Sequence, residues 1–360
     1  MKQAYRVGIV GASSLLGQEL VRILEEHKFP VSSLVRFETD EEEPDLPVVD
    51  LSEHPETFAA EEATAATELD LVFVASRRGE LPLSLRPMLE AAQQDLAPLP
   101  AKARRPVVID LVEALGQPSG EERRVILSVP FLERIRQLAD TAGPPLDSRF
   151  YASPHPAAIV LSALLLRLAA RFPLQSAVAL IFFPASEMGS GAIEELQKQT
   201  VNLLSFQKIP RNVFGAQLAF NLLAQLGGKH AAELTEIESR IRGQLRQYLG
   251  GRVPLPAVRL CQAPVFYSLA FSLYVETTQP AASEALGAAL AGEHIHVRRR
   301  TEPAPSQVEA AGLSHILVDT IAPDPDHAAG VWIWAAVDNI RLAAVNAVEI
   351  AESVRDQLRR

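Results

Sequence analysis

The sequence predicts an α/β protein with two domains: a doubly wound parallel sheet with helices, and an α+β domain with a mostly antiparallel sheet. The length of 360 residues is enough for two hydrophobic cores. Short apolar strands alternate with amphipathic helices over roughly the first 150 residues, which is typical of a parallel sheet with helical crossovers. Longer apolar strands follow in the second half, and this change of pattern indicates the second domain.

The first strand, turn and helix lie between Val7 and Pro30. A β-branched run that ends at Val10 is typical of a buried parallel strand, and Gly11 follows where the chain must turn. From Leu15 the apolar residues recur at helical spacing, and Pro30 prevents the helix from continuing. This succession predicts a Rossmann-like, dinucleotide-binding arrangement.

The turn between this strand and helix is a candidate phosphate-binding loop. Gly11 allows a tight bend, Gly17 allows the helix to approach the strand, and the helix N-terminus offers amides to a pyrophosphate. Ser14 stands where a middle glycine would permit the closest approach, so it either tightens the turn or hydrogen-bonds a phosphate. The same turn also serves as scaffold alone, which leaves cofactor occupancy open. We expect the cofactor contacts to come from Gly11, Ala12, Ser13, Ser14, Leu15, Leu16 and Gly17.

A second strand is expected at Ser33–Phe37, and the residue that follows it is Glu38. An acidic side chain at this strand end binds the free hydroxyls of an adenosine ribose and repels a 2′-phosphate. If a dinucleotide binds, the sequence therefore favours NAD over NADP. The alternative interpretation is an acidic, solvated loop that runs from Glu38 to Pro44.

Composition excludes several classes of function. Hydrophobic residues make up 48% and charged residues 22% of the chain, as in an ordinary soluble globular protein. A net charge of −10 argues against a general binder of nucleic acid or anionic membranes. The basic groups at Arg77-Arg78, Arg104-Arg105 and Arg298–Arg300 are interpreted as solvated faces.

Cysteine and histidine usage excludes two further kinds of site. The single cysteine, Cys261, rules out an internal disulfide and favours a reducing cytoplasm. The eight histidines show no metal-ligand spacing, and no apolar run reaches the length of a membrane span. We therefore expect a cytoplasmic protein without a metal site and without a nucleic-acid or membrane partner.

The remaining elements follow from apolar runs and helical periodicity. In the first domain we expect strands at Glu68–Ala75, Val107–Asp110 and Val125–Val129, helices at Leu83–Ala92 and Phe131–Ala139, a proline-rich connector at Pro98–Pro106 and a loop at Thr141–Asp147. In the second half we expect an apolar helix within Phe150–Arg171, strands at Gln175–Phe183, Ala263–Glu276, His315–Ile321 and Val331–Val337, and helices at Ala192–Leu204 and Leu234–Tyr248. A final helix spans Ile340–Leu358, with Asp338 and Asn339 as capping residues.

Four segments along the chain are similar to those of one family. They are VGIVGASSLLGQELVRILEEHKFP (Val7–Pro30), FGAQLAFNLL (Phe214–Leu223), QAPVF (Gln262–Phe266) and VDNIRLAAVNAVEIAE (Val337–Glu352). Together they resemble the aspartate-semialdehyde dehydrogenases, and the second with the third resembles the Usg-type branch of that family.

The resemblance implies an NAD(P)-binding Rossmann-like domain that the last helix rejoins, and a central substrate and dimerisation domain. We therefore place the domains at 1–152 with 338–360 and at 153–337, and expect a homodimer. The family reductively dephosphorylates an acyl phosphate through a cysteine thioester, with NADP as the hydride donor.

The positions that carry this chemistry in the family hold other residues here. Ser153–Pro156 reads SPHP, and Pro156 takes the position of the cysteine nucleophile. Leu269 stands at the position of the family's histidine base, and Gln262 at that of the arginine that grips the substrate carboxylate. Proline has no nucleophile but suits the first turn of a helix. We therefore predict no catalytic residue of the family's kind and interpret this turn as a helix start.

Two further positions complete the expected cofactor contacts. The glycine-rich segment that the family places after its third strand begins here at Ser76 and continues as Arg77-Arg78. Asn339 is retained, and in the family this residue approaches the nicotinamide. Asn339 also stands at the start of the last helix, where capping that helix would be reason enough for an asparagine. Both interpretations of Asn339 stay open.

Other residues are weaker candidates for replacing the lost groups. Cys261 is expected on a buried strand, away from the family's catalytic positions. His155 and Ser153 lie near the expected centre, but no carboxylate that would orient the imidazole is identifiable, so we interpret them as loop or cap residues. Glu238 and Arg240 are two apart on a helix and point to different faces, so we expect both at the surface.

Three hypotheses follow. In the first, the chain is a homodimeric dehydrogenase-fold protein that has lost the thioester chemistry and binds a small-molecule ligand or a partner. In the second, it is an active NAD(P)-dependent oxidoreductase that acts on an aldehyde or oxo group of a small carboxylate by a changed mechanism, for instance direct hydride transfer with His155 as the acid. In the third, it is a structural dimer with an empty turn.

Overall fold

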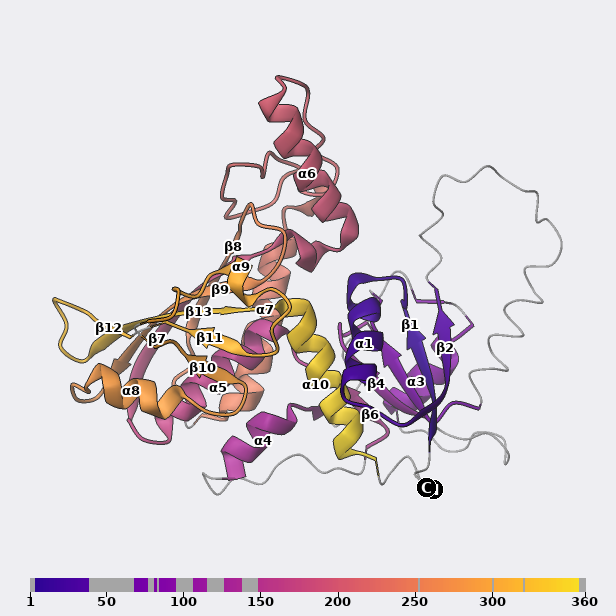
Figure 1. Ribbon diagram of the computed structural model, residues 1–360, viewed down its shortest axis with the longest axis horizontal. Helices are drawn as coiled ribbons and strands as arrows, with labels where there is room; N and C mark the ends of the chain where they lie inside the picture. The colour runs from indigo at the N-terminus through magenta and orange to yellow at the C-terminus, as the bar shows by residue number, and fades with distance from the viewer. Residues whose placement is uncertain are drawn as a thin grey trace. The chain divides into compact units, whose positions relative to one another are not determined.

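The computed structural model describes residues 4–38, 68–76, 81–82, 84–94, 106–114, 126–137, 148–251, 253–299, 301–319 and 321–355. These residues fall into two compact units (Figure 1). Unit 1 lies within Met1–Pro130, Gly143–Pro154 and Ala343–Arg360, and unit 2 within Phe131–Ala142 and His155–Leu342. Some segments named above lie outside the described residues: 39–44, Arg77-Arg78, the connector at 98–105 with Arg104-Arg105, the loop at 141–147 and Arg300.

Unit 1 is built on a parallel sheet, which confirms the α/β prediction. Its strands are β1 (Tyr5–Val10), β2 (Val31–Phe37), β3 (Leu71–Val74), β4 (Val107–Asp110), β5 (Ile126–Leu127) and β6 (Phe150–Ala152). They are joined in the order β2-β1-β3-β4-β6-β5, and every pair is parallel. Helices α1 (Leu15–Glu26) and α3 (Arg86–Gln94) form the crossovers after β1 and β3.

One helix is shared by the two units. Helix α10 (Asn339–Ser353) begins in unit 2 and continues in unit 1 from Ala343. Its apolar residues beyond that point enter the same core as those of β1, β3, β4 and α1, so the sheet of unit 1 is covered by chain that is remote in sequence. The residues that α10 and the position after it contribute to this core are Ala344, Val345, Ala347, Val348, Ile350, Ala351 and Val354.

Unit 2 contains a mixed, mostly antiparallel sheet, as the sequence predicts. Its strands are β7 (Leu174–Phe183), β8 (Ala257–Gln262), β9 (Leu269–Thr277), β10 (Ile295–Val297), β11 (Ile316–Val318), β12 (Ala322–Pro323) and β13 (Gly330–Val337). The order is β10-β11-β13-β9-β7-β8, with β12 beside β13. Four of these pairs are antiparallel, and only β10 with β11 and β7 with β8 are parallel.

The two faces of this sheet differ. Helix α5 (Pro156–Ala169) is apolar on all sides and mostly buried; it packs against β7, α7 (Glu233–Leu249) and α8 (Ser283–Leu290). On the other side, side chains of β7, β9 and β13 stay exposed or half-buried. We call this side the open sheet face and define it by Val178, Leu180, Tyr274 and Trp332, of which Tyr274 pairs with both Val178 and Trp332.

An arm extends from unit 2 between β7 and α7. It consists of α6 (Ser190–Leu204) and the segment that returns from it to Gly227 (Figure 1). Buried Glu195 accepts the backbone amides of Asn212, Val213 and Phe214 at 2.6, 2.9 and 3.2 Å. One turn further along α6, the Gln199 side chain accepts the amides of residues 218 and 219 at 2.7 and 3.1 Å. The returning segment is therefore held in shape by two side chains of the helix.

The strand expected at Ala263–Glu276 is wrong in its first half. Strand β8 ends at Gln262 and β9 begins at Leu269, with a turn between them. Ser268 has a φ of 71°, which a strand cannot continue, and its amide donates to the Asn339 side-chain oxygen Oδ1 at 3.2 Å. The apolar side chains of this turn produced the strand-like pattern. The short elements η2 (Ala185–Met188), η3 (Gly228–His230), α8, β10 and α9 (Gln307–Ala310) were not expected.

Candidate functional site

The predicted phosphate-binding turn lies at the switch point of the parallel sheet. Strand β1 has β2 on one side and β3 on the other, so the crevice opens at the carboxyl ends of β1 and β3. Gly11 follows β1 and has a φ of 78°, and a Cβ placed on it would lie 2.8 Å from the Cβ of Ser76, which follows β3. A Cβ on Gly17 would lie 2.2 Å from the Gly11 oxygen. Both positions therefore need glycine.

Ser14 closes this turn on itself. Its hydroxyl accepts the Gly17 amide at 3.0 Å, as an N-cap of α1 (Leu15–Glu26) does, and donates to the Gly11 oxygen at 2.7 Å. These two bonds tighten the turn. Ala12 is buried beside it, and Leu15 and Leu16 form the first turn of the helix.

Two further predicted residues adjoin the turn. Glu38 accepts the Ser13 amide on its Oε2 at 3.1 Å, which places a carboxylate at the rim of the crevice. Ser76 is only 2% exposed, and among the described residues its hydroxyl has no hydrogen-bond partner. An unsatisfied buried hydroxyl beside a glycine cradle fits a phosphate-bearing ligand. The residues predicted from Gly11 to Gly17, with Glu38 and Ser76, thus come together in unit 1.

Unit 2 contains a second candidate centre, at the start of α5 (Pro156–Ala169). His155 is the N-cap residue: its Nδ1 accepts the Ala157 amide at 3.1 Å, and Pro156 follows as the first helical residue. The predicted helix start is confirmed. The His155 amide donates to Gln244 Oε1 at 2.9 Å, and the imidazole stacks on Phe183 with ring centroids 5.6 Å apart.

The acidic partner of this imidazole is Glu187, which was not predicted from the sequence. His155 Nε2 lies 3.2 Å from Glu187 Oε2, and the two side chains are 3% and 12% exposed. Because Nδ1 accepts an amide proton, Nε2 is the ring nitrogen that faces the carboxylate, at ion-pair distance. Glu187 lies on a short 3₁₀ helix after β7, and its sequence context gave no sign that it would reach the turn before α5.

Other polar groups surround the Glu187 carboxylate. Burial by itself raises its pKa, but His155, the charge of Arg240 and a hydrogen bond with the Asn339 side chain outweigh that effect. The pKa of Glu187 therefore lies below its ordinary value, and the carboxylate is ionised at neutral pH. The groups around this charge come from four elements that are separate in sequence. We call the residues Glu187, His155, Arg240, Asn339 and Gln244 the Glu187 cluster.

Asn339 belongs to this cluster within unit 2. It is 4% exposed, and its Oδ1 accepts the Ser186 hydroxyl at 3.3 Å and the Ser268 amide at 3.2 Å. These contacts join the 3₁₀ helix after β7, the turn before β9 and the start of α10. Asp338 caps α10 by accepting the Arg341 amide at 3.0 Å, which agrees with the predicted helix start.

The expectation that Glu238 and Arg240 lie at the surface is wrong. Glu238 is 5% exposed and pairs with Arg259 at 3.5 Å, while Arg240 is half-buried and its charge acts on Glu187. Glu238 lies among the buried residues of α7 (Glu233–Leu249), which packs against α5 and β8.

The remaining positions singled out by the resemblance lie in packed surroundings. Gln262 is fully buried and donates to the Phe183 carbonyl at 2.9 Å, and Leu269 is fully buried at the start of β9. Cys261 is half-buried, and burial raises the pKa of its thiol, so the thiol stays protonated at neutral pH. In unit 1, Ser153 is buried and accepts the Asn346 amide group at 2.8 Å.

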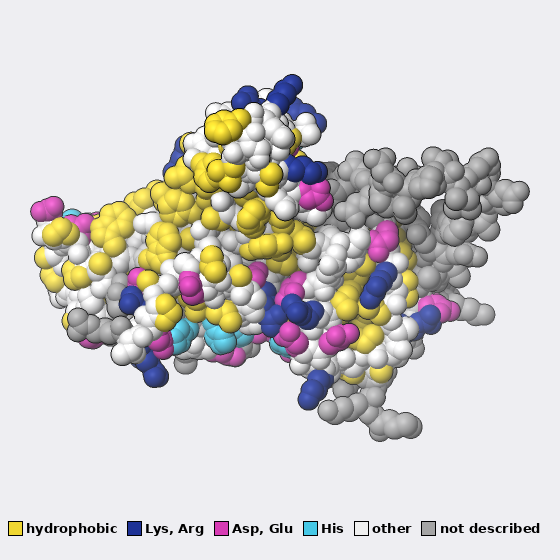
Figure 2. Space-filling model, turned by 45° about the horizontal axis from the view of Figure 1, so that its top comes forward, with side chains coloured by type: hydrophobic (Ala, Val, Ile, Leu, Met, Phe, Trp, Pro, Cys, Tyr) yellow, Lys and Arg dark blue, Asp and Glu magenta, His cyan; other side chains and the backbone are white. Residues whose placement is uncertain are grey.

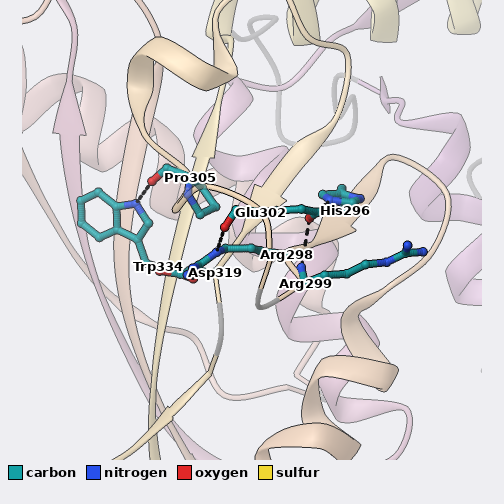
Figure 3. Close-up of polar contacts among 7 residues, drawn as sticks. All are labelled: His296, Arg298, Arg299, Glu302, Pro305, Asp319 and Trp334. Carbon is teal, nitrogen blue, oxygen red and sulfur yellow. Dashed lines mark hydrogen bonds and ion pairs between the residues drawn. The ribbon is translucent and has the colours of Figure 1, made fainter.

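One basic group interpreted as a solvated face has a structural role instead. Arg298 donates to Asp319 at 2.6 Å and to the Glu302 backbone oxygen at 2.7 Å, and Glu302 also contacts His296 at 2.8 Å (Figure 3). Trp334 donates to the Pro305 oxygen at 2.9 Å. These contacts fix the loop after β10 (Ile295–Val297) and form no part of the Glu187 cluster.

Two kinds of site are absent from the residues that the structure describes. Nowhere in these ranges do three or more His, Cys, Asp or Glu side chains gather in a way that would hold a metal ion. Within the same ranges, none of the helices has both the length and the apolar character needed to cross a membrane.

Comparison with known proteins identifies similar chains along almost the whole length. The semialdehyde dehydrogenase NAD-binding domain matches residues 6–90, and the semialdehyde dehydrogenase dimerisation domain matches residues 165–342. A USG-1 protein homolog of Azotobacter vinelandii is 28% identical over 358 residues, which are 98% of each chain.

Solved structures agree with these matches. The chain superposes on a probable aspartate-semialdehyde dehydrogenase of Pseudomonas aeruginosa with a TM-score of 0.75 and 26% identity, covering 98% of this chain and 99% of that one. It also superposes on aspartate semialdehyde dehydrogenase II of Vibrio cholerae with a TM-score of 0.76 and 24% identity, covering 99% of both chains. At 24% identity, the likeness to the Vibrio cholerae structure shows a shared fold and nothing more.

Proposed function

This chain belongs to the semialdehyde dehydrogenase family, in its Usg-type branch, and from that premise we propose that it is a homodimeric member without thioester chemistry, which acts by binding a ligand or a partner. The observation that carries the proposal is the turn before α5. The resemblance puts the family's nucleophile at Pro156, and Pro156 is here a buried helical residue behind a histidine cap.

The chemistry of a thioester enzyme has no support in this centre. Such an enzyme needs a thiolate and a base within hydrogen-bond reach of it. Both ring nitrogens of His155 are engaged, one by the helix amide and one by Glu187. Leu269, at the position of the family's base, is a buried apolar residue and cannot take a proton. The raised pKa of the Cys261 thiol disfavours a thiolate there.

We further propose that the turn from Gly11 to Gly17 binds a nicotinamide dinucleotide, with NAD preferred over NADP. The glycine cradle and the unsatisfied Ser76 hydroxyl support a phosphate-bearing ligand. Glu38 supports the preference, because its carboxylate at the Ser13 amide would repel a 2′-phosphate. When bound, the cofactor would supply a ring that accepts or donates hydride; the residues named here would hold its phosphates and ribose.

The proposed homodimer uses the open sheet face. Val178 and Leu180 on β7 and Trp332 on β13 are 49%, 38% and 45% exposed, and β9 lies between these two strands. Figure 2 shows hydrophobic side chains gathered over this part of unit 2 and on the arm. An apolar surface of this kind is typical of an interface. The face lies within the residues that match the dimerisation domain.

The test is an assay of NAD- and NADP-dependent oxidation of aspartate semialdehyde in the presence of phosphate or arsenate, paired with cofactor titrations. We expect no turnover above a blank without protein, and a larger thermal shift with NADH than with NADPH. Robust turnover that disappears when Pro156 or His155 is substituted would overturn the proposal.

One observation favours the second hypothesis, an oxidoreductase that uses His155 as its acid. A buried imidazole beside a carboxylate is an arrangement that general acid–base catalysts use. In that case a small oxo-carboxylate should be reduced by NADH with a pH optimum that follows the imidazole, and His155→Asn should abolish the reaction while keeping NADH binding. The capping bond to Ala157 argues against this hypothesis, because a turnover cycle would have to break it.

A further inference from the structure

The Glu187 cluster has the donor set of a binding site for a carboxylate. The His155 imidazole lies 3.2 Å from Glu187 Oε2, the Arg240 charge acts on the carboxylate, and the Asn339 side chain hydrogen-bonds it. Side-chain donors of this kind recognise free carboxylates, since they give charge and direction together. In this chain the carboxylate in that position belongs to the side chain of Glu187 and not to a bound ligand.

Another buried carboxylate of unit 2, that of Glu195, is held differently. Glu195 accepts three backbone amides of the segment that it organises, so it shapes the chain locally. Glu187 instead meets side chains from three other elements: the turn before α5, α7 and the start of α10. The Glu187 side chain keeps 12% of its surface exposed, unlike that of Glu195.

We propose that the Glu187 cluster is a carboxylate-binding site that the chain fills with its own Glu187. This inference rests on the proposed function, because it explains why the centre takes no substrate: the internal carboxylate already occupies the position that an external one would use. Chemically, the site would accept a small aliphatic monocarboxylate once Glu187 is shortened.

Glu187→Ala with acetate is the matched experiment. Alanine keeps the Cβ atom, and acetate supplies the atoms that the substitution removes. We expect the variant to lose about 5–15 °C in Tm, as when one partner of a buried ion pair is removed. Sodium acetate should restore a large part of that loss in a saturable way, while sodium chloride at equal ionic strength should not.

Three controls make the result specific. Wild type and Glu187→Gln, whose sites stay filled, should show no saturable acetate effect. Glu187→Ala combined with Arg240→Gln should lose most of the acetate effect, because the guanidinium charge is gone. Equal acetate shifts in wild type and Glu187→Ala, or a Glu187→Ala variant that folds and ignores acetate, would overturn the inference.

A folding failure of Glu187→Ala leaves the inference testable. In that case Glu187→Gly is refolded from urea with and without propionate, which supplies the missing Cβ as well. Recovery of folded protein only with propionate supports the site, and recovery that is absent or equal in chloride refutes it. Turnover in the semialdehyde assay would refute the proposed function without changing these binding results, so the two failures are distinguishable.

Discussion

The properties of His155 follow from what its two ring nitrogens touch. Nδ1 accepts a helix amide, and Nε2 lies 3.2 Å from Glu187 Oε2. The sequence allowed the capping role to be predicted, because proline after a polar residue marks a helix start. The contact with Glu187 could not be predicted, because Glu187 lies on a different element and local sequence patterns carry no information about contacts between remote residues.

Glu187 makes the stability of unit 2 depend on pH. Its pKa is lower in the folded chain than the value of about 4.3 in an unfolded chain, since His155, Arg240 and Asn339 outweigh burial. The carboxylate therefore stabilises the fold above that unfolded value, and the effect is lost as the pH falls through the folded-state pKa.

The measurement is urea unfolding of wild type and Glu187→Gln across a pH series. We expect the variant to be less stable by about 2–4 kcal/mol at pH 7, with the difference shrinking below about pH 4. Glu194→Gln is the control, because Glu194 is exposed on α6 and should show a difference near zero at every pH. A difference for Glu187→Gln that is constant from pH 7 to pH 3 would contradict the assignment.

Gly17 and Gly243 give opposite predictions for the same substitution. A Cβ at Gly17 would meet the Gly11 oxygen at 2.2 Å, whereas a Cβ at Gly243, within α7, meets nothing within 4 Å. We expect Gly17→Ala to destabilise unit 1 by about 1–3 kcal/mol or more and to weaken dinucleotide binding. Gly243→Ala should stabilise the chain by up to about 1 kcal/mol, because alanine is the better helix former. Thermal unfolding with and without NADH measures both, and equal signs would refute the close approach.

At the scale of elements, periodicity predicted what lies within one strand or helix and failed at the joins. The strand at Val107–Asp110 and the helices α6 and α7 match their expected positions to within two residues, because each has a clear apolar pattern. The strand expected at Ala263–Glu276 was too long, because the turn at 263–268 is also apolar and is fixed by a remote contact between Ser268 and Asn339. Such contacts are invisible in a local pattern.

The arm offers a prediction at this scale. Removing the carboxylate of Glu195 leaves the amides of Asn212, Val213 and Phe214 without their acceptor. We expect Glu195→Ala to cost about 2–4 kcal/mol and to raise hydrogen exchange at those amides, while the sheet of unit 2 keeps its protection. Glu194→Ala, one residue away and exposed, should leave the exchange pattern unchanged. Unchanged protection of residues 212–214 in Glu195→Ala would show that Glu195 does not organise the arm.

For the whole molecule, composition and the order of elements were enough to predict the fold class, because a parallel sheet with crossovers and a mostly antiparallel sheet leave different patterns in sequence. The open sheet face was not predicted as such. Alternation along β7 shows that one side is buried and the other less so, but only the paired strands show that Val178, Tyr274 and Trp332 form one surface.

The proposed dimer is tested on this surface. The substitution Leu180→Glu puts a charge in the middle of the open sheet face, so it should convert a dimer into a monomer of 39.1 kDa. Arg242→Glu is the control, because Arg242 is exposed on α7, which packs against α5 on the opposite side of the sheet. Light scattering coupled to size exclusion gives both masses. A Leu180→Glu variant that keeps twice the monomer mass would exclude this face as the interface.

The course of α10 has a consequence for synthesis on the ribosome. The parallel sheet that is translated first has part of its core supplied by Ala344 to Val354, so it stays incomplete until translation has passed those codons and the segment has left the exit tunnel. The second unit needs nothing beyond Leu342 and is complete earlier. The unit whose strands are translated first therefore completes its core last, and those strands stay accessible to chaperones for the longest time.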